Sequence, residues 1–130
     1  MIARLTLLAA AALILTAAQD APAPPAARGA DVTGAWSVDL RIADDGEPYS
    51  QPMNLVIAAD GTITGDFYSS TINSGRYGRN RGRSCVAFTT SDGQGPYRHA
   101  ACLIDGRMVG QSWAEHRQFV LPWVADRPTP

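Results

Sequence analysis

The sequence predicts an all-β fold, namely a small antiparallel up-and-down (meander) β-barrel of about eight strands with one disulfide hairpin. Seven segments alternate apolar and polar residues as strands do, and an eighth lies around residues 73–77. Short connections containing Gly and Asp separate them, and both cysteines fall in one hairpin. A meander of about eight strands can close and so remove its exposed edges, and no segment shows a helical period.

Residues 1–18 have the pattern of a signal peptide. Arg4 is the only charge, an apolar run LTLLAAAALIL follows, and Thr16–Ala18 offers small residues for cleavage. The run is too short for a transmembrane anchor, and no Cys near the cleavage site could carry a lipid. We expect a protein exported to the periplasm or the cell exterior, with no lipid anchor and no membrane span in the mature chain.

The rest of the chain reads as a linker, one domain and a short tail. Residues 19–32 are rich in Pro and Ala, which predicts a flexible linker, residues 33–127 form the single barrel domain, and residues 128–130 are the tail. The chain holds 11 basic residues, all of them Arg, and 12 acidic residues, so loss of Arg4 leaves ten against twelve. This slightly acidic balance gives no case for general nucleic-acid binding, and none is expected.

The first strand is predicted over residues 34–42, where alternate positions share one apolar face: Trp36, Val38, Leu40 and Ile42. A loop follows over residues 43–51. The next two strands form a hairpin around Ala59-Asp60-Gly61. A three-residue loop with Gly61 left-handed keeps one continuous apolar face, because it opposes these pairs: Ile57 with Ile63, and Leu55 with Gly65.

Four arginines follow between residues 76 and 83, namely Arg76, Arg79, Arg81 and Arg83. Two interpretations stay open for them. They are either a solvated loop or edge strand, in which the charges keep the protein soluble, or a rim at the barrel mouth that contacts an anion or a partner.

The hairpin over residues 85–102 can be numbered residue by residue. A two-residue type II′ turn at Gly93-Gln94 makes every opposed pair sum to 187, so that Cys85 faces Cys102 at a non-hydrogen-bonded position. Pro96 also falls where its missing N–H is not needed. A disulfide there closes a short loop and contributes roughly 3 kcal/mol in the chain-entropy model.

The same register separates two faces of this hairpin. The better core face carries Val86, Phe88, Thr90, Tyr97, His99, Ala101 and Leu103, and the disulfide therefore lies on the outer face. After it, a two-residue turn at Asp105-Gly106 would pair Leu103 with Met108 and turn Trp113 outward, whereas a bulged turn would send Trp113 inward. The last strand carries Phe119, Leu121 and Trp123 on one face.

Short motifs resemble the calycin superfamily of ligand-binding barrels, and most of all its avidin branch. Residues 33–36 (TGAW) resemble the Gly-x-Trp start of the first strand, and residues 59–65 (ADGTITG) resemble the second avidin hairpin, with Phe67 and Ser69 after it. The resemblance implies that Arg127 packs across Trp36 as a structural pair and that Ser69 contacts a ligand. Phe67 stands where avidins place a ligand-contacting Tyr, so the resemblance supports the fold more than biotin binding.

The leading functional prediction is a barrel that binds a small, mostly apolar ligand through these residues: Ser69, Phe88, Tyr97, His99 and Ser112. His99 is alternatively a core histidine with satisfied hydrogen bonds. The alternative function is an envelope interaction or structural module whose barrel is filled by its own side chains. The expected partners are accordingly a small molecule or an exported protein.

No catalytic constellation is visible, and we predict that the chain is not an enzyme. Glu115 and His116 are adjacent, so on a strand they would point to opposite faces. The chain has two His, and its two Cys are expected to be paired, so neither a metal nor a cofactor is expected.

Overall fold

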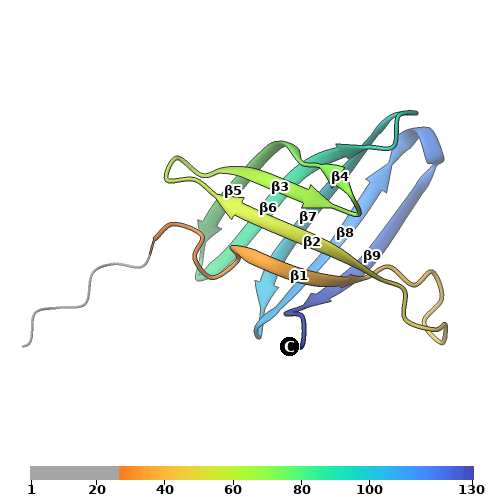
Figure 1. The fold of residues 1–130 in the computed structure, drawn as a ribbon, viewed down its shortest axis with the longest axis horizontal. Coiled ribbons are helices and arrows are strands. Elements are labelled where there is room, and N and C mark those ends of the chain that lie inside the picture. Colours follow the sequence, from red (N-terminus) through yellow and green to blue (C-terminus); the bar gives the residue numbers. More distant parts are fainter. Residues whose placement is uncertain (1–26) are drawn as a thin grey trace, which may run out of the picture.

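The structure, a computed structural model, describes residues 27–130, which form a closed antiparallel β-barrel (Figure 1). Its elements are β1 (Gly34–Asp39), β2 (Ser50–Ile57), β3 (Thr62–Phe67), β4 (Ser70–Thr71), β5 (Asn73–Asn80), β6 (Arg83–Ser91), β7 (Pro96–Ile104), β8 (Arg107–Ala114), the 3-10 turn η1 (Glu115–Arg117) and β9 (Phe119–Asp126). In this part of the chain no helix is long and apolar enough to cross a membrane.

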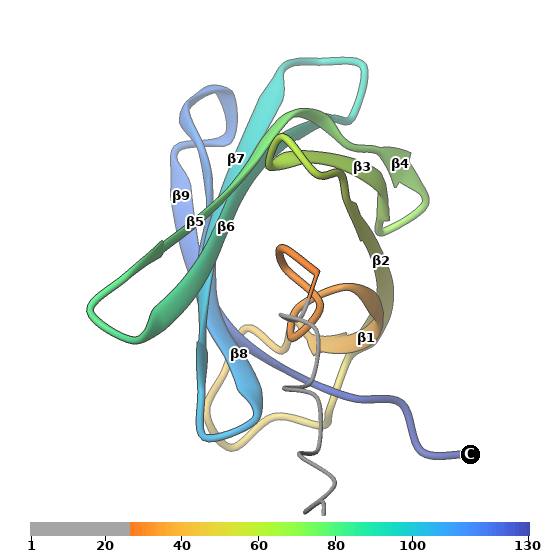
Figure 2. The same cartoon turned by 90° about the vertical axis from the view of Figure 1, so that its left-hand side faces the viewer.

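Most strands that are neighbours in the sheet are also consecutive in the sequence. The sheet order is β2-β1-β9-β8-β7-β6-β5-β3-β4, and a further pairing of β2 with β3 closes the barrel. Figure 2 shows the resulting ring of strands. The two-residue strand β4 adds to β3, and the other eight strands make the barrel. This confirms the all-β meander of about eight strands, an architecture consistent with a calycin-like fold.

The hairpin of β6 and β7 has the predicted register. Cys85 faces Cys102 and Ser91 faces Pro96, so the opposed pairs sum to 187 throughout, and the two cysteines form a disulfide. Val86 and Phe88 are buried while the neighbouring Ala87 is exposed. The disulfide therefore lies on the outer face of the barrel, as expected.

Two further hairpins also have the predicted pairing. Leu55 faces Gly65 across β2 and β3, and Gly61 takes the left-handed conformation at φ +88°. Across β7 and β8, Leu103 faces Met108 through a two-residue turn. Trp113 consequently points outward, where it stays 44 % exposed under the Arg98 guanidinium.

The first strand is shorter than predicted. It ends at Asp39, and Ile42, expected on the inner face of the strand, is 92 % exposed in the loop that follows. The Asp39 carboxylate accepts hydrogen bonds from the backbone N–H groups of Arg41 and Tyr49 and from the Arg41 side chain. These bonds hold the chain in a turn where alternation alone predicted more strand.

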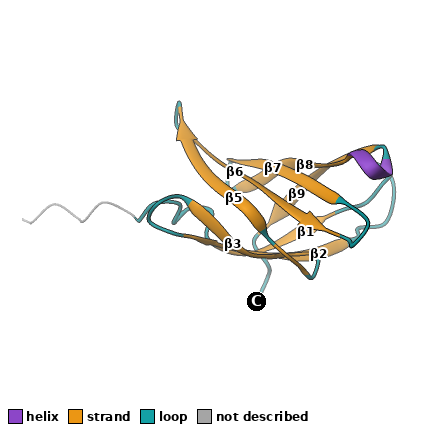
Figure 3. Ribbon diagram, turned by 90° about the horizontal axis from the view of Figure 1, so that it is seen from above, coloured by secondary structure: helices purple, strands orange, loops and turns teal. Residues whose placement is uncertain are grey.

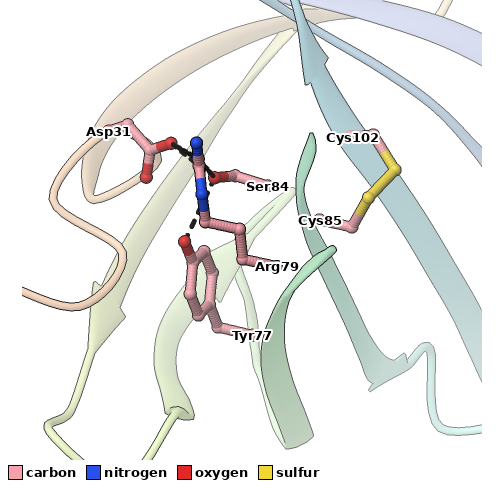
Figure 4. Close-up of a disulfide and its surroundings, with 6 residues drawn as sticks. All are labelled: Asp31, Tyr77, Arg79, Ser84, Cys85 and Cys102. Carbon is pink, nitrogen blue, oxygen red and sulfur yellow. Dashed lines mark hydrogen bonds and ion pairs between the residues drawn. A yellow bond between two sulfur atoms is a disulfide. The ribbon is translucent and has the colours of Figure 1, made fainter. Parts of the chain in front are cut away.

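The described part of the chain before β1 forms a turn that belongs to the barrel, although the sequence placed the domain boundary at residue 33. Val32 is fully buried, and its carbonyl accepts a 2.9 Å hydrogen bond from the Trp36 indole. The Ser84 hydroxyl donates to Asp31 at 2.5 Å and accepts from Arg79 and Tyr77 (Figure 4). The signal peptide and the first part of the linker lie outside the described residues.

Arg127 closes the same end of the barrel from the other terminus. Its guanidinium lies 3.8 Å from the centre of the Trp36 ring and donates to the carbonyl oxygens of Thr33, Ala35 and Asp31. This is the packing that the resemblance implied for these two residues. Together with the turn before β1, it covers this end of the core, whose buried apolar side chains include Trp36, Val38, Met53, Leu55, Met108 and Ala125.

Candidate functional site

A cavity of about 340 Å³ opens at the other end of the barrel. The 3-10 turn η1, drawn in purple in Figure 3, lies at this end. Three connections border the cavity: the β1–β2 loop, the β3–β4 turn and the β6–β7 loop. Its lining is mostly apolar or aromatic, with a few hydroxyls and one imidazole: Leu40, Ile42, Tyr49, Phe67, Tyr68, Ser70, Thr90, Ser91, Asp92, Tyr97, His99, Ser112, Phe119 and Leu121.

A row of hydrogen bonds crosses four neighbouring strands beneath this cavity. The Trp123 indole on β9 donates to the Ser112 hydroxyl on β8 at 2.8 Å. Ser112 Oγ lies 2.6 Å from His99 Nδ1 on β7, and His99 Nε2 lies 2.9 Å from the Thr90 hydroxyl on β6. All four side chains are at most 7 % exposed. These side chains meet because the register of β6, β7 and β8 places Thr90, His99 and Ser112 at neighbouring positions on the inner face of the barrel.

Aromatic rings enclose the imidazole of His99. Its centre lies 4.8 Å from that of Phe67 and 4.9 Å from that of Phe88, and Tyr97 stacks on it at 6.3 Å. Burial lowers the pKa of His99 to about 4, because desolvation disfavours the charged imidazolium. The imidazole is therefore neutral at pH 7, with one nitrogen that donates and one that accepts.

We expect His99 to destabilise the barrel as the pH falls below neutrality. Its pKa is about 4 in the folded protein against about 6.5 for an unperturbed histidine, so between these values the unfolded chain binds the proton more readily. The stability that neutral His99 supports is complete above about pH 6.5 and is lost as the pH falls towards 4. Unfolding of the wild type and of His99→Gln at several pH values isolates this term, and NMR titration gives the midpoint. A midpoint near 6.5 would contradict a buried, neutral His99.

An ion cluster fastens two of the loops at the cavity mouth. Asp92, in the β6–β7 loop, accepts hydrogen bonds from Arg117 at 2.7 and 3.0 Å and lies 3.3 Å from His116 Nε2. Desolvation acts to raise the pKa of Asp92. Hydrogen bonds from Arg117, from the Gln94 and Gly95 amides and from His116 outweigh it and hold that pKa well below the usual range. Glu115 and His116 lie in η1 rather than on a strand, and His116 is committed to this cluster.

The structure brings three of the five predicted ligand-contacting residues to the cavity: Tyr97, His99 and Ser112. Phe88 lies behind His99 instead of lining the cavity. Ser69 is exposed outside it, and its neighbour Ser70 lines it. Tyr68 and Ser69 both take the left-handed conformation in a tight turn that pairs Phe67 with Ser70. No Gly or Asn marks that turn, so the sequence did not reveal that Ser70, rather than Ser69, lines the cavity.

The four arginines of the predicted rim lie away from the cavity. They sit on the hairpin of β5 and β6, from Arg76, which faces Ala87 in the middle of β6, to Arg83, where β6 begins. The cavity is lined by Thr90 and Ser91, where β6 ends. Arg79 is engaged with Ser84 and Asp31 (Figure 4). The hairpin therefore does not form a rim around the mouth of this cavity. Contact of these arginines with an anion or a partner stays a prediction.

Sequence reasoning missed several residues of the cavity. Thr90 was placed on the inner face of the hairpin but was not singled out, although its pairing with Tyr97 puts it two positions from His99. Phe119 and Leu121 were placed on one face of the last strand but were not singled out as cavity residues. Ile42 was expected on the inner face of the first strand but reaches the cavity from the loop that follows β1. Tyr49, in the same loop, had no signal, because no periodicity extends through a loop.

Comparison with protein-family models, with curated proteins and with solved structures returned no match. The class of the protein therefore rests on its own geometry. Within residues 27–130, no cluster of three His, Cys, Asp or Glu side chains could hold a metal ion. The fold and the site define a disulfide-bonded, closed antiparallel β-barrel with a mostly apolar cavity at one end.

Proposed function

We propose that this protein is an exported, calycin-like barrel that binds a small, mostly apolar ligand in the cavity beside η1. The observation that carries the proposal is the cavity itself, about 340 Å³ in volume and open among the loops. Ligand sites of known barrels are concave and mostly apolar, with a few polar groups that orient the ligand. Thr90, His99 and Ser112 are such groups here, set among aromatic and aliphatic walls.

Other features support export and the calycin-like assignment. Disulfides persist in oxidising compartments, which favours a periplasmic or extracellular location for a chain with the Cys85–Cys102 bond. The stacking of Arg127 on Trp36 is the contact that the resemblance implies for these two residues. Avidin-like ligand contacts have less support, since Ser69, the contact that the resemblance implied, lies outside the cavity.

The alternative function, an interaction module with a self-filled barrel, draws on the outer face. Trp113 is 44 % exposed on β8 and lies under Arg98 of β7, and aromatic residues and Arg are enriched at protein interfaces. The cavity counts against this alternative, because a self-filled barrel would leave no such volume. Ligand binding therefore remains the better-supported function.

A cavity-filling substitution tests the proposal. We expect wild-type protein to bind 6-propionyl-2-(dimethylamino)naphthalene, a neutral dye whose emission shifts to the blue in apolar surroundings. Leu121→Trp replaces an aliphatic side chain of the cavity with a bulky indole and should weaken this binding at least tenfold, since the dye and the indole would compete for one volume. Val120→Trp is the matched control, because Val120 precedes Leu121 on β9 and is 55 % exposed.

Native mass spectrometry of protein purified from its own envelope complements the dye, because it reports any retained ligand and the oligomeric state. The proposal predicts an added mass that is absent from Leu121→Trp and present in Val120→Trp. If the wild type carries no added mass and the dye does not bind, the cavity has no ligand function and the outer face becomes the functional surface. Equal dye binding by the two Trp variants would also contradict the proposed site.

A further inference from the structure

The hydrogen bonds beneath the cavity leave one hydroxyl proton without an acceptor. Trp123 Nε1 can only donate, so Ser112 Oγ accepts from it. The neutral imidazole of His99 then offers one donor and one acceptor to the two hydroxyls beside it, Ser112 and Thr90. Counting donors and acceptors, one of these two hydroxyls must keep a proton that no other described residue receives.

The distances assign that proton to Thr90. Hydrogen bonds donated by O–H groups are shorter than those donated by N–H groups, about 2.7 Å against about 2.9 Å. The Ser112–His99 contact is 2.6 Å, which suits Ser112 donating to Nδ1, and the His99–Thr90 contact is 2.9 Å, which suits Nε2–H donating to Thr90. Thr90 Oγ is thus an acceptor from His99, and its own O–H is free to donate.

The free O–H belongs to a cavity-lining group that water reaches poorly. Thr90 is 7 % exposed and lines the cavity together with Ser91, at the end of β6. A buried donor without an acceptor is costly, so a ligand that supplies an acceptor at this point gains the bond and removes that cost. The site therefore selects for an acceptor atom at the buried end of the ligand.

The charges around the cavity disfavour an anionic ligand, and its mostly apolar lining disfavours a charge of either sign. None of its lining residues is an Arg or Lys, His99 is neutral, and Asp92 at the mouth is ionised. The β1–β2 loop that borders the mouth adds Asp44, Asp45 and Glu47. Arg117 and Arg41 are each paired with a carboxylate, so a carboxylate ligand would find no free cation in this part of the structure.

We propose that Thr90 is the specificity-determining donor of the cavity and that the ligand is a neutral molecule with a carbonyl oxygen at its buried end, such as a ketone, ester or amide. The carbonyl accepts from Thr90 Oγ, and the apolar remainder lies against Phe67, Phe119 and Leu121. This inference rests on the proposed function, because it assigns the chemistry of the ligand that the cavity would take.

Two dyes that differ in one propionyl group, which carries the carbonyl, test the assignment. We would measure fluorescence titrations with 6-propionyl-2-(dimethylamino)naphthalene and with 2-(dimethylamino)naphthalene, which lacks the ketone. Thr90→Val keeps the shape of the side chain and removes the hydroxyl, and it should weaken binding of the ketone about tenfold while leaving the carbonyl-free dye unchanged. Thr90→Ser retains the hydroxyl and should bind the ketone as the wild type does.

The outcomes distinguish a failure of the Thr90 assignment from a failure of the proposed ligand-binding function. If both dyes bind and Thr90→Val affects them equally, Thr90 is not a carbonyl donor, yet the cavity still binds ligands. Failure of both dyes to bind the wild type overturns the proposed function and this inference with it. A ¹⁵N NMR spectrum of His99 gives an independent reading, with a proton expected on Nε2. A proton on Nδ1 would place the free O–H on Ser112 and overturn the assignment to Thr90.

Discussion

Replacing both cysteines with serine (Cys85→Ser with Cys102→Ser) is expected to lower the free energy of unfolding by about 3 kcal/mol. The two residues are 17 apart in sequence and directly opposed across β6 and β7, so the bond closes a short loop in the unfolded chain. The domain is small, and a single core of this size has little stability to spare. For a domain of 60–100 residues, a loss of this size corresponds to a drop in Tm of about 12–24 °C.

Thermal and urea unfolding of the oxidised wild type, the reduced wild type and the double variant measure this effect. Reductant should destabilise the wild type and leave the double variant unchanged, which separates the disulfide from other effects of the solvent. The bond lies on the outer face, away from the cavity. The reduced wild type and the double variant should therefore keep the fold and bind the naphthalene dye at temperatures well below their Tm. A double variant as stable as the oxidised wild type would show that the bond contributes no net stability and would contradict this prediction.

The hairpins were predictable because their turns and their alternation specify one register. Gly61 and Gly106 mark turns whose geometry decides which residues oppose each other, and a shift of one residue would turn every apolar side chain outward. The pairing of Cys85 with Cys102 then followed from counting. These local rules placed Tyr97, His99 and Ser112 on the inner face without any knowledge of the closed barrel.

The remainder depends on contacts that no local pattern encodes. The cavity is bordered by loops, and its mouth is shaped by the Asp92–Arg117 ion pair, which joins residues 25 apart in sequence. Val32 is fully buried next to β1, a contact that no periodic pattern before the first strand announced. Each of these features is decided by the packing of distant segments, which periodicity does not report.

The close approach of β2 and β3, whose pairing closes the barrel, can be tested by adding a Cβ atom at Gly65. We expect Gly65→Ala to lower the free energy of unfolding by at least about 4 kcal/mol, among the largest effects that one substitution causes. A Cβ atom at this position would lie 1.9 Å from the Asn54 carbonyl oxygen, which belongs to the facing strand and cannot move aside as a flexible side chain would. Gly65 also has φ +130°, a conformation that residues with a Cβ rarely adopt.

Gly78→Ala is the matched control, because Gly78 lies on β5 and an added Cβ would meet nothing within 4 Å. This variant should stay within about 0.5 kcal/mol of the wild type in the same unfolding experiment. If Gly65→Ala unfolded at the same urea concentration as Gly78→Ala, β2 and β3 could not approach as closely as described, and the closure of the barrel there would be wrong. The same variant bears on function, since Phe67, two residues along β3, forms part of the cavity wall. Opening this pairing should therefore weaken dye binding under conditions where the rest of the sheet is still folded.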